Sequence, residues 1–535
     1  MKSYLKISPV GGVKQIGSNC TLIETNSQRL LIDCGILFPN EGVFDINYLI
    51  PDLSHIEDID TIIITHGHED HIGAISHFIE AFPSATIYAP RFAKELIKYK
   101  LSQKKISKEI HDLSKQIFTD IEVEAFHVNH SIPDTKGLLI THEALNLAIT
   151  FISDFKIDKK TTYEALFNFD IIKEASAKYS RRISLLDSTN VLSKNLETPS
   201  EMDLIEPLKN IIKKCPGNTY VTTFSSNIHR IQTLINIARD LGRVIIPYGR
   251  SMQRYIETAL DTEFLTGDDL IKDADDTSVK RKKIILLSGC QGEFRGALKR
   301  VVSKQDSRFK LSDKDFVIFS SKAIPGNEKE ISLIYNDIVE QGPELFTPEL
   351  NLIHASGHPG RENLREVYNA FKPTHAFPIH GESLFLKEHV KFITENKLAE
   401  YSQMILNGDE IVITDKVKVL NKDHHPEPIL IHGKDLPIER SKISERRKIA
   451  TQGIVLVSFS KESINKFKPT FEITYQGLPE FISEHTEEFS KAIIKEFQAL
   501  KKSPIDEKKE KIRIFVRRYY GNILGYRPIA IIHIC

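Results

Sequence analysis

The sequence feature that most constrains the fold is an apolar strand that leads directly into a loop rich in His and Asp. The run Ile62–Ile64 is followed by Thr-His-Gly-His-Glu-Asp-His, residues 65–71, and an apolar helical pattern begins at Ile72. A short β-branched run of this kind predicts a strand buried in a sheet. Three imidazoles and a carboxylate so close together form a nitrogen and oxygen donor set suited to zinc, with manganese as an alternative. The segment predicts a metal site between a buried strand and a helix N-terminus.

The order of donors within this loop favours two metal ions over one. His66 and His68 point the same way along an extended segment, because side chains alternate there. Asp70 and His71 then turn in a different direction, and Gly67 has no side chain to obstruct the approach. A polar turn that is rich in His without binding metal is the alternative. Such a fixed pattern arises by chance in only about one chain in a thousand, so we expect a two-metal site.

Further candidate ligands follow predicted strands elsewhere in the chain. His130 follows one strand, Asp154 follows the apolar run Ala148–Ser153, and His380 ends a run that starts at His375. A single His at a strand end is more often an ordinary surface or core residue. Together with residues 66–71, however, these three side chains complete one hydrolase site.

Composition limits the classes of protein to consider. At 535 residues the chain is too long for one core, and 41% hydrophobic with 27% charged residues is typical of a globular protein. The five cysteines are scattered without a CxxC pair, which fits a reducing cytosol and argues against a cysteine-built zinc site. No apolar run approaches a membrane span and no secretory signal begins the chain, so we expect a cytoplasmic protein without membrane contact. The 72 basic and 72 acidic residues balance, so local positive charge, metal ions included, must hold any anionic substrate.

The chain divides into regions of different secondary-structure pattern. The first 200 residues contain short β-branched strands separated by turns, with helical stretches between some of them. The next region, up to about His354, alternates short apolar runs with helical patterns, which predicts βα units and a largely parallel sheet. Strand-rich character then returns, followed by a charged tract with three prolines between Asn421 and Arg447 that predicts a linker. The remainder predicts a small α+β unit.

These motifs resemble the metallo-β-lactamase superfamily, whose members carry HxHxDH, a later His, a bridging Asp and a final His. Four more segments are similar to its nucleic-acid-cutting β-CASP branch: Asp187–Asn190, Ser288–Glu293, Ser321–Glu328 and His354–His358. Four others resemble the ribonuclease J family: Asn129–Asp134, Ser226–Arg230, Gly249–Met252 and Pro378–Glu382. The similarity extends from Gly11 to the C-terminal unit with its Arg517-Arg518 and Arg527-Pro528 pairs.

The resemblance implies a fold and its domain boundaries. We expect an α/β protein in which a metallo-β-lactamase αββα sandwich, residues 1–200 and 356–420, is interrupted by a β-CASP domain with a parallel sheet at 201–355. A linker at 421–447 would lead to a small α+β C-terminal domain at 448–535.

The resemblance also implies a role for each candidate site residue. One zinc ion would be held by His66, His68 and His130, and the other by Asp70, His71 and His380, with Asp154 bridging. Two zinc ions per subunit, with Mn²⁺ or Mg²⁺ as alternatives, would activate a water for in-line attack on an RNA phosphodiester. Asp70 would also orient that water. His358 would protonate the leaving 3′ oxygen, and Asp187 would keep His358 protonated.

A polar pocket beside the metals is the last element that the resemblance implies. Its residues are Ser225, Ser226, Ser320, Ser321, His354, Ser356, Gly357 and His358. Such hydroxyls and backbone N–H groups suit a 5′ phosphate. The implied activity is a 5′-to-3′ exonuclease on single-stranded 5′-monophosphate RNA, with endonuclease action as a second activity, in mRNA decay and rRNA maturation. A homodimer or homotetramer and RNA-degradation partners are also expected.

The sequence departs from the family pattern at three places. Ser153 replaces the usual Gly before the bridging Asp, Ser288-Gly289-Cys290 replaces Thr-Gly-Ser, and Pro359-Gly360 follows His358. None of these changes removes a ligand. They affect the shape of the nucleotide pocket, and with it the balance between exonuclease and endonuclease action.

Two other interpretations compete with a nuclease. The first is a hydrolase of the same fold that acts on a thioester, lactone or lactam; such an enzyme needs neither the insertion of about 150 residues nor the pair Asp187 and His358. The second is a non-catalytic RNA-binding or assembly subunit, although all seven ligands and the acid are present. Four phenylalanines near the motifs would either stack on bases or pack in the core, and core packing is favoured: Phe126, Phe155, Phe224 and Phe294.

Overall fold

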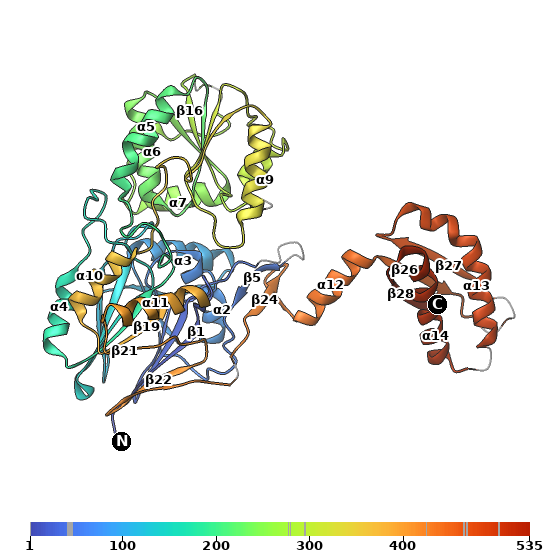
Figure 1. Ribbon diagram of the computed structural model, residues 1–535, viewed down its shortest axis with the longest axis horizontal. Helices are drawn as coiled ribbons and strands as arrows, with labels where there is room; N and C mark the ends of the chain where they lie inside the picture. Colours follow the sequence, from blue (N-terminus) through green and yellow to red (C-terminus); the bar gives the residue numbers. More distant parts are fainter. Residues whose placement is uncertain are drawn as a thin grey trace. The chain divides into compact units, whose positions relative to one another are not determined.

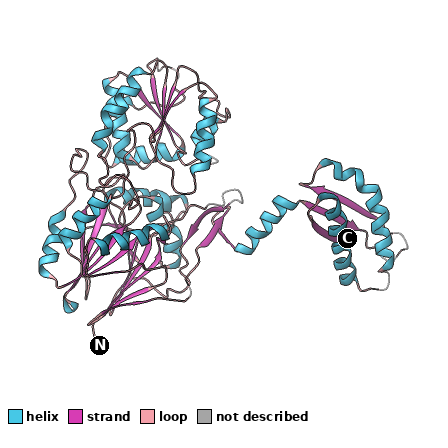
Figure 2. Ribbon diagram, in the orientation of Figure 1, coloured by secondary structure: helices cyan, strands magenta, loops and turns pink. Residues whose placement is uncertain are grey.

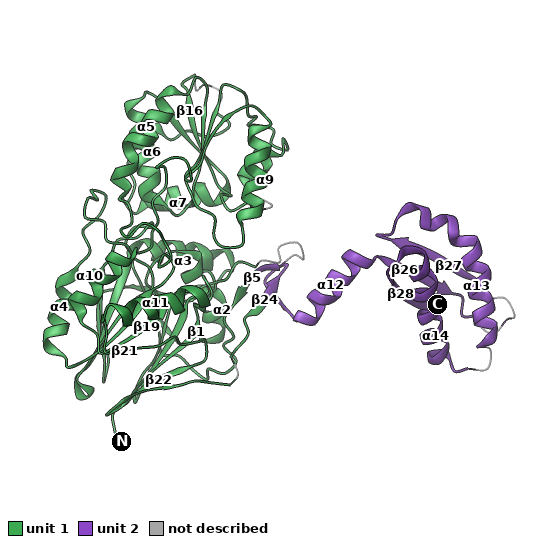
Figure 3. Ribbon diagram, in the orientation of Figure 1, with its two compact units in different colours: residues 1–40, 48–429 green, residues 41–47, 430–535 purple. Residues whose placement is uncertain are grey.

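The computed structural model is drawn in Figure 1 and, coloured by secondary structure, in Figure 2. It describes residues 2–39, 46–276, 278, 280–293, 296–423, 425–463, 466, 469–500 and 503–534. The chain forms two compact units, coloured separately in Figure 3: Met1–Asn40 with Tyr48–Ile429, and Glu41–Asn47 with Leu430–Cys535. Among the described residues, no helix has both the length and the apolar character needed to cross a membrane.

Two sheets form the base of the first unit. The first has the order β23 (Val417–Leu420), β22 (Glu410–Ile413), β1 (Leu5–Gly11), β3 (Cys20–Thr25), β4 (Arg29–Ile32), β6 (Thr61–Ile63), β7 (Thr86–Ala89) and β8 (Ile110–Asp112). The second has the order β21 (Tyr401–Ser402), β19 (His375–Ile379), β13 (Arg181–Asp187), β12 (Leu147–Ile152), β11 (Lys136–His142), β10 (Glu122–His127) and β9 (Lys115–Ile117). One buried cluster joins their facing sides, with Ile23 and Ile63 from the first sheet and Ile140 and Ile183 from the second.

Helices cover the outer faces of these sheets. A second buried cluster packs α4 (Phe169–Lys178), α10 (Arg361–Phe371) and α11 (Ser383–Glu395) against the second sheet, with Ile172 and Leu364 beside Ile152. On the other side, α2 (Ile75–Ala81) and α3 (Arg91–Gln103) alternate with β6, β7 and β8 in sequence and bury Phe78 and Phe92. The predicted αββα sandwich is confirmed.

An inserted α/β region follows β13. Its five strands are all parallel and have the order β15 (Val244–Tyr248), β16 (Lys283–Leu287), β14 (Thr219–Thr222), β17 (Phe316–Phe319) and β18 (Glu344–Phe346). The helices among them are α5 (Ile205–Lys214), α6 (Ile228–Asp240), α7 (Arg250–Asp261), α8 (Ala297–Val302) and α9 (Glu328–Val339), and they flank the sheet in Figure 1. The predicted parallel sheet is confirmed, as the alternation of apolar runs and helical patterns indicated.

The chain returns to the sandwich after the insertion. Strand β19 pairs in parallel with β13, and β22 pairs antiparallel with β1, so the late segment adds strands to both sheets. A small pair, β2 (Val13–Lys14) with β20 (Gly381–Glu382), joins the two parts of the sandwich again. Strands β12, β13 and β19 run in parallel, so the residues that follow their carboxyl ends gather on the same side of the second sheet, where these strands end.

The second unit contributes strands to two small sheets. The first has the order β25 (Leu436–Ile438), β24 (Ile429–His432) and β5 (Ile46–Ile50), and α12 (Arg440–Gln452) follows it. The tract expected to be a linker therefore carries strands and the start of a helix, and His424 within it lies outside the described residues. Leu430 and Ile431 are buried, which explains why an otherwise charged tract adopts regular structure. The second sheet, of order β27 (Phe471–Gln476), β26 (Ile454–Phe459) and β28 (Ile529–Ile534), packs on α13 (Thr486–Ala499) and α14 (Ile505–Leu524).

Candidate metal centre and acid–base pair

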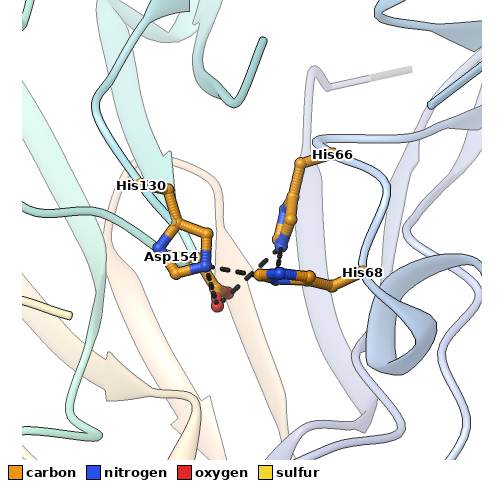
Figure 4. Close-up of side chains that lie close together, drawn as sticks. All are labelled: His66, His68, His130 and Asp154. Carbon is orange, nitrogen blue, oxygen red and sulfur yellow. Dashed lines mark hydrogen bonds and ion pairs between the residues drawn. The ribbon is translucent and has the colours of Figure 1, made fainter. Parts of the chain in front are cut away.

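Four of the predicted ligands converge at the edge of the sandwich, as Figure 4 shows: His66, His68, His130 and Asp154. One donor atom from each lies within 4.8 Å of the others. The Nδ1 atom of His68 is 3.1 Å from His66 Nε2 and 3.2 Å from His130 Nε2. Asp154 Oδ2 is 3.5 Å from His130 Nε2. His68 is half-buried and the other three side chains are buried.

The remaining three predicted ligands form an adjoining group. The donor atoms of Asp70, His71 and His380 also lie within 4.8 Å of one another. Asp154 lies between the two groups, because its Oδ1 atom is 3.0 Å from both His71 Nε2 and His380 Nδ1. All seven side chains singled out from the sequence are thus brought together, with one carboxylate shared by both groups.

The chemistry of this cluster fits metal cations. Burial lowers the pKa of His66 and His130 well below the ordinary value, which keeps both rings in the neutral form that binds metals. Burial would raise the pKa of the Asp154 carboxyl, but His380, His71 and His66 hold it well below its usual range. Asp154 Oδ1 and His380 Nδ1 are buried and 3.0 Å apart, but the geometry between them is poor for a hydrogen bond, so a cation between the donors would satisfy both atoms better than their direct contact does.

Two residues outside the predicted set orient these rings. His71 Nδ1 lies 2.7 Å from Asp33 Oδ2, and the same carboxylate accepts from the backbone N–H and hydroxyl of Thr65. Asn19 Nδ2 lies 2.9 Å from His71 Nε2. Carboxylates behind metal-binding imidazoles typically fix their orientation. Sequence reasoning missed Asp33, although it ends the run Leu30–Ile32 as Asp154 ends its own apolar run.

His380 has an unusual backbone conformation. Its φ is +49°, in the left-handed region that a residue with a side chain rarely adopts. The carbonyl of His380 accepts from the backbone N–H of Ser188 at 3.3 Å and from the hydroxyl of Thr189 at 3.1 Å. These two bonds hold the strained turn that directs His380 toward Asp154.

The predicted acid and its partner are in direct contact. His358 Nδ1 lies 2.7 Å from Asp187 Oδ2, and Asp187, the last residue of β13, has no exposed surface. Burial would lower the pKa of His358, but the charge and hydrogen bond of Asp187 raise it to about 9. His358 is therefore cationic at neutral pH. Its ring centroid is 5.1 Å from that of His130, so the cation lies beside the metal cluster.

The predicted phosphate-pocket residues occupy different environments. Ser356 Oγ accepts from the backbone N–H of His358 at 3.1 Å, and Gly357 carbonyl accepts from His130 at 2.7 Å. Ser320 Oγ is buried and bonded to the Ile353 carbonyl, while the Ser321 hydroxyl is buried without a partner. In the part of the chain that the structure describes, neither Ser225 nor Ser226 forms a hydrogen bond with the other predicted pocket residues. Ser225 Oγ instead lies 3.1 Å from Ser251 Oγ.

A buried ion pair behind this pocket was not predicted. Arg230 binds Glu201 in a bidentate manner, with Nε to Oε2 at 2.8 Å and Nη2 to Oε1 at 3.0 Å. Arg230 Nη1 also donates to the carbonyls of Ser320 and Ile353 and to the Ser320 hydroxyl. The motif Ser226–Arg230 signalled that Arg230 matters, but no pattern indicated its partner, because the two residues belong to separate segments.

The phenylalanines near the motifs are mostly core residues. Phe126 and Phe155 belong to the buried cluster beneath α4 and α10. Phe224 is half-buried, and Phe294 lies outside the described residues. The expected preference for core packing is confirmed for the first two.

The fold and the clustered donors define a metal-dependent hydrolase of the metallo-β-lactamase superfamily, and residues 13–144 match that superfamily's sequence model. Residues 216–338 match the model described as "Ribonuclease J, beta-CASP domain", and residues 349–399 match "Zn-dependent metallo-hydrolase RNA specificity domain". Ribonuclease J from Sinorhizobium meliloti is 30% identical over 549 residues, which cover 98% of this chain and 96% of that protein. The chain belongs to the ribonuclease J family.

Other similar proteins agree with this assignment. Ribonuclease J from Synechocystis is 30% identical over 85% of this chain and 72% of its own length, and the protein from Helicobacter pylori strain 26695 is 29% identical over 93% and 73%. A crystal structure of a protein of unknown function from Enterococcus faecalis V583 has a TM-score of 0.54 at 14% identity, covering 77% of this chain and 100% of that chain, and so shares the fold. The chain is a metal-dependent ribonuclease that binds RNA.

Proposed function

We propose that this ribonuclease uses two zinc ions to remove nucleotides one at a time from the 5′ end of 5′-monophosphate RNA. The observation that carries the proposal is the position of Asp154 between two donor groups, with the cationic His358 beside them. A water that attacks phosphorus and a leaving oxygen on the opposite side need stabilisation at both ends. The cluster of metal donors would stabilise the attacking water, and His358 would stabilise the leaving oxygen.

The donor residues divide between two ions. His66, His68 and His130 would hold one ion, Asp70, His71 and His380 the other, and Asp154 both; zinc suits this nitrogen-rich set, with Mn²⁺ or Mg²⁺ as alternatives. When bound, the ions supply Lewis-acid activation of water and neutralise charge on the phosphate. Asp70 is partly exposed, so its carboxylate can accept a hydrogen bond from the attacking water and orient it.

His358 would complete the hydrolysis as the general acid. Its Nδ1 is bound to Asp187, which leaves the Nε2 proton for the substrate. The water oxygen bonds to phosphorus, the bond from phosphorus to the 3′ oxygen breaks, and the Nε2 proton moves to that oxygen. The products are a nucleoside 5′-monophosphate and an RNA shortened by one residue. The shortened RNA again carries a 5′ monophosphate, so the reaction can repeat.

Cleavage of end-labelled RNA tests this function. RNAs with a 5′ monophosphate, triphosphate or hydroxyl would be digested with and without EDTA, alongside Asp154→Asn as a metal-site variant. We expect labelled mononucleotides from the monophosphate RNA alone and none with EDTA or with the variant. Internal fragments from all three RNAs would overturn the exonuclease proposal in favour of endonuclease action.

We further propose roles in mRNA decay and rRNA maturation, carried out by a homodimer or homotetramer together with RNA-degradation partners. Strand β28, at the edge of the C-terminal sheet and carrying Ile531 at 45% exposure, is the feature that supports self-association, because an edge strand can pair with another chain. Sedimentation of the full chain, compared with Ile531→Asp, tests the oligomeric state. A monomer for the wild type would overturn that part of the proposal.

A further inference from the structure

The carbonyl of Gly67, which lies between two of the clustered histidines, accepts a hydrogen bond from the inserted domain. Tyr255 on α7 donates its hydroxyl hydrogen to this oxygen at 3.3 Å. Both residues are buried, so water does not readily replace the bond when it is lost. All seven clustered donors belong to the sandwich, and Tyr255 is thus a contact from the inserted domain to the loop that carries two of them.

Helix α3 of the sandwich packs against the same glycine. A Cβ atom added to Gly67 would lie 2.8 Å from Leu96 Cδ1 and 3.4 Å from the Cα of Ala93, both on α3. Real Cβ atoms essentially never approach another atom within 3.0 Å, so this side of Gly67 has no free space. The loop is therefore held by two helices, α3 from the sandwich and α7 from the inserted domain.

The position of Tyr255 depends on how α7 packs against α3, its neighbour in Figure 1. The guanidinium of Arg254 lies 3.9 Å from the centroid of the Tyr99 ring. Phe264, shortly after α7, meets Phe92 edge to face with ring centroids 5.7 Å apart. Both kinds of contact stabilise packed surfaces. The docking of the two domains therefore places the Tyr255 hydroxyl at the loop.

The peptide at Gly67 sets the direction of His68. His66 and His68 extend from one short segment toward the same cluster, as Figure 4 shows, and the His68 backbone is extended, with φ −72° and ψ 151°. His66 and His130 each have a further contact behind the ring, at Nδ1. No hydrogen bond from the described residues reaches Nε2 of His68. The backbone before it is therefore the main support for the direction of this ring.

We propose that Tyr255 is a positioning residue for the metal ion of the first donor group, which consists of His66, His68, His130 and Asp154. The inference deepens the proposed two-metal function and rests on it. Without the hydroxyl, the buried Gly67 carbonyl loses its donor and the peptide gains freedom to rotate. His68 then points less accurately at the ion, and the ion binds more weakly.

The second donor group, Asp70, His71 and His380, is supported differently. Asp33 and Asn19, both in the sandwich, contact the His71 ring at 2.7 Å and 2.9 Å. Neither residue belongs to the inserted domain, so removing the Tyr255 hydroxyl should leave this group in place. The two metal ions should therefore respond differently to the same substitution.

Zinc binding by the full-length chain tests the proposal. Metal-free protein would be titrated with Zn²⁺ in competition with a chromogenic chelator, and the affinity for each of the two ions would be fitted separately. Tyr255→Phe removes one hydroxyl and keeps the ring. We expect it to weaken the binding of one ion by about 2- to 10-fold, the effect of one lost hydrogen bond. The affinity for the other ion should change little.

Tyr220→Phe is the matched control. Tyr220 is also a buried residue of the inserted domain, and its hydroxyl donates to a backbone carbonyl, that of Lys310, at the same distance of 3.3 Å. Both variants lose an equivalent bond and should unfold at slightly lower denaturant concentration, but Tyr220→Phe should bind both ions as the wild type does. Equal zinc binding by the two variants would mean that Tyr255 has a structural role alone and would overturn the proposal.

Asp33→Asn identifies which ion is affected. This variant should weaken the ion of the second donor group, because Asp33 orients His71. The double variant Tyr255→Phe, Asp33→Asn should weaken both ions, each by the factor seen in the single variant. The proposal fails if Tyr255→Phe weakens the same ion as Asp33→Asn. A wild type that binds fewer than two zinc ions would instead overturn the two-metal function on which the inference rests.

Discussion

His358 and Asp187 lie 171 positions apart in the chain, yet Nδ1 of the imidazole is 2.7 Å from Oδ2 of the carboxylate. Asp187 ends a central strand of the second sheet, and His358 lies in the segment by which the chain returns from the inserted domain. The contact between His358 and Asp187 therefore forms only when both parts of the sandwich and the inserted domain are in place. Because Asp187 is buried, water does not screen its charge, and it holds the proton on His358 strongly.

Replacing Asp187 by Asn should impair the chemical step selectively. The amide keeps the side-chain shape but removes the charge that keeps His358 protonated. We expect kcat to fall by about 10²- to 10⁴-fold, with a small change in KM and unchanged metal content. Single-turnover cleavage of 5′-monophosphate RNA measures this, with the exposed Asp170→Asn as control. A wild-type rate for Asp187→Asn would rule out the assignment of His358 as the acid.

Replacing Asp154 by Asn should disrupt both donor groups at once. The carboxylate lies 3.0 Å from both His71 and His380, and the amide cannot supply its charge to two cations. We expect fewer metal ions per chain, measured by elemental analysis after dialysis, together with loss of RNA cleavage. Asp170→Asn should retain the wild-type metal content. Full metal occupancy in Asp154→Asn would contradict a shared ligand.

Replacing Asp33 by Asn should weaken metal binding without removing a ligand. Asp33 lies 2.7 Å from His71 Nδ1 and fixes the ring orientation. Loss of such a supporting carboxylate typically lowers metal affinity about 10- to 100-fold. Competition with a chromogenic chelator measures the affinity directly, without relying on activity. An affinity equal to that of the wild type would show that the Asn19 contact suffices to orient the His71 ring.

The buried Glu164 should make stability depend on pH. Burial raises its pKa to about 8 despite a hydrogen bond from Asn129, whereas the unfolded chain has the ordinary value near 4.5. The folded state therefore favours the protonated form, and this contribution is complete below pH 4.5 and is lost as pH rises through about 8. His229, 3.8 Å away, has its pKa lowered to about 4 by burial and stays neutral over most of this range.

Glu164→Gln removes this titration and provides the test. Between pH 5 and 8 the unfolding free energy of the wild type should fall relative to that of the variant, by at most about 1.4 kcal/mol per pH unit. Denaturant unfolding at several pH values measures the difference, with the exposed Glu174→Gln as control. A difference between wild type and Glu164→Gln that stays constant with pH would show that Glu164 does not titrate in this range.

Removing Arg230 should destabilise the inserted region strongly. Arg230→Met leaves the buried Glu201 carboxylate without its bidentate partner and removes the hydrogen bonds from Arg230 to the carbonyls of Ser320 and Ile353. We expect a loss of about 3–5 kcal/mol in unfolding free energy. The double variant Arg230→Met, Glu201→Leu should recover much of this loss, because no uncompensated charge remains. A double variant as unstable as the single one would mean that the carbonyl bonds, rather than the ion pair, carry the effect.

The sequence allowed the seven donors to be predicted because each follows an apolar run that is recognisable as a strand. The parallel course of β12, β13 and β19 then places Asp154, Asp187 and His380 at one edge. Asp33 has the same signal, but its role depends on the angle at which His71 leaves the short helix α1 (Glu69–Ile72), and no periodicity encodes that angle.

Other features of the site could not be predicted from sequence patterns for similar reasons. The Ser320 hydroxyl is bonded to Ile353 inside the fold, which a Ser-rich motif cannot reveal. The pairing of Arg230 with Glu201 joins separate segments, and only the packed structure shows that both are buried. The prolines and charges of residues 421–447 indicated a linker, yet helix α12 begins within this tract at Arg440. The helix is compatible with the prolines because it begins only after the last of them, Pro437.

The place of His380 on the returning segment has a consequence for the protein during its own synthesis. Six of the seven clustered donors lie within the first 154 residues, but the seventh is translated more than two hundred residues later. The strands β19 and β22, which complete both sheets, are also translated late. A nascent chain therefore carries an incomplete cluster until the inserted domain has left the ribosome. The cutting site can therefore mature only after the returning segment has been translated, long after the six earlier donors.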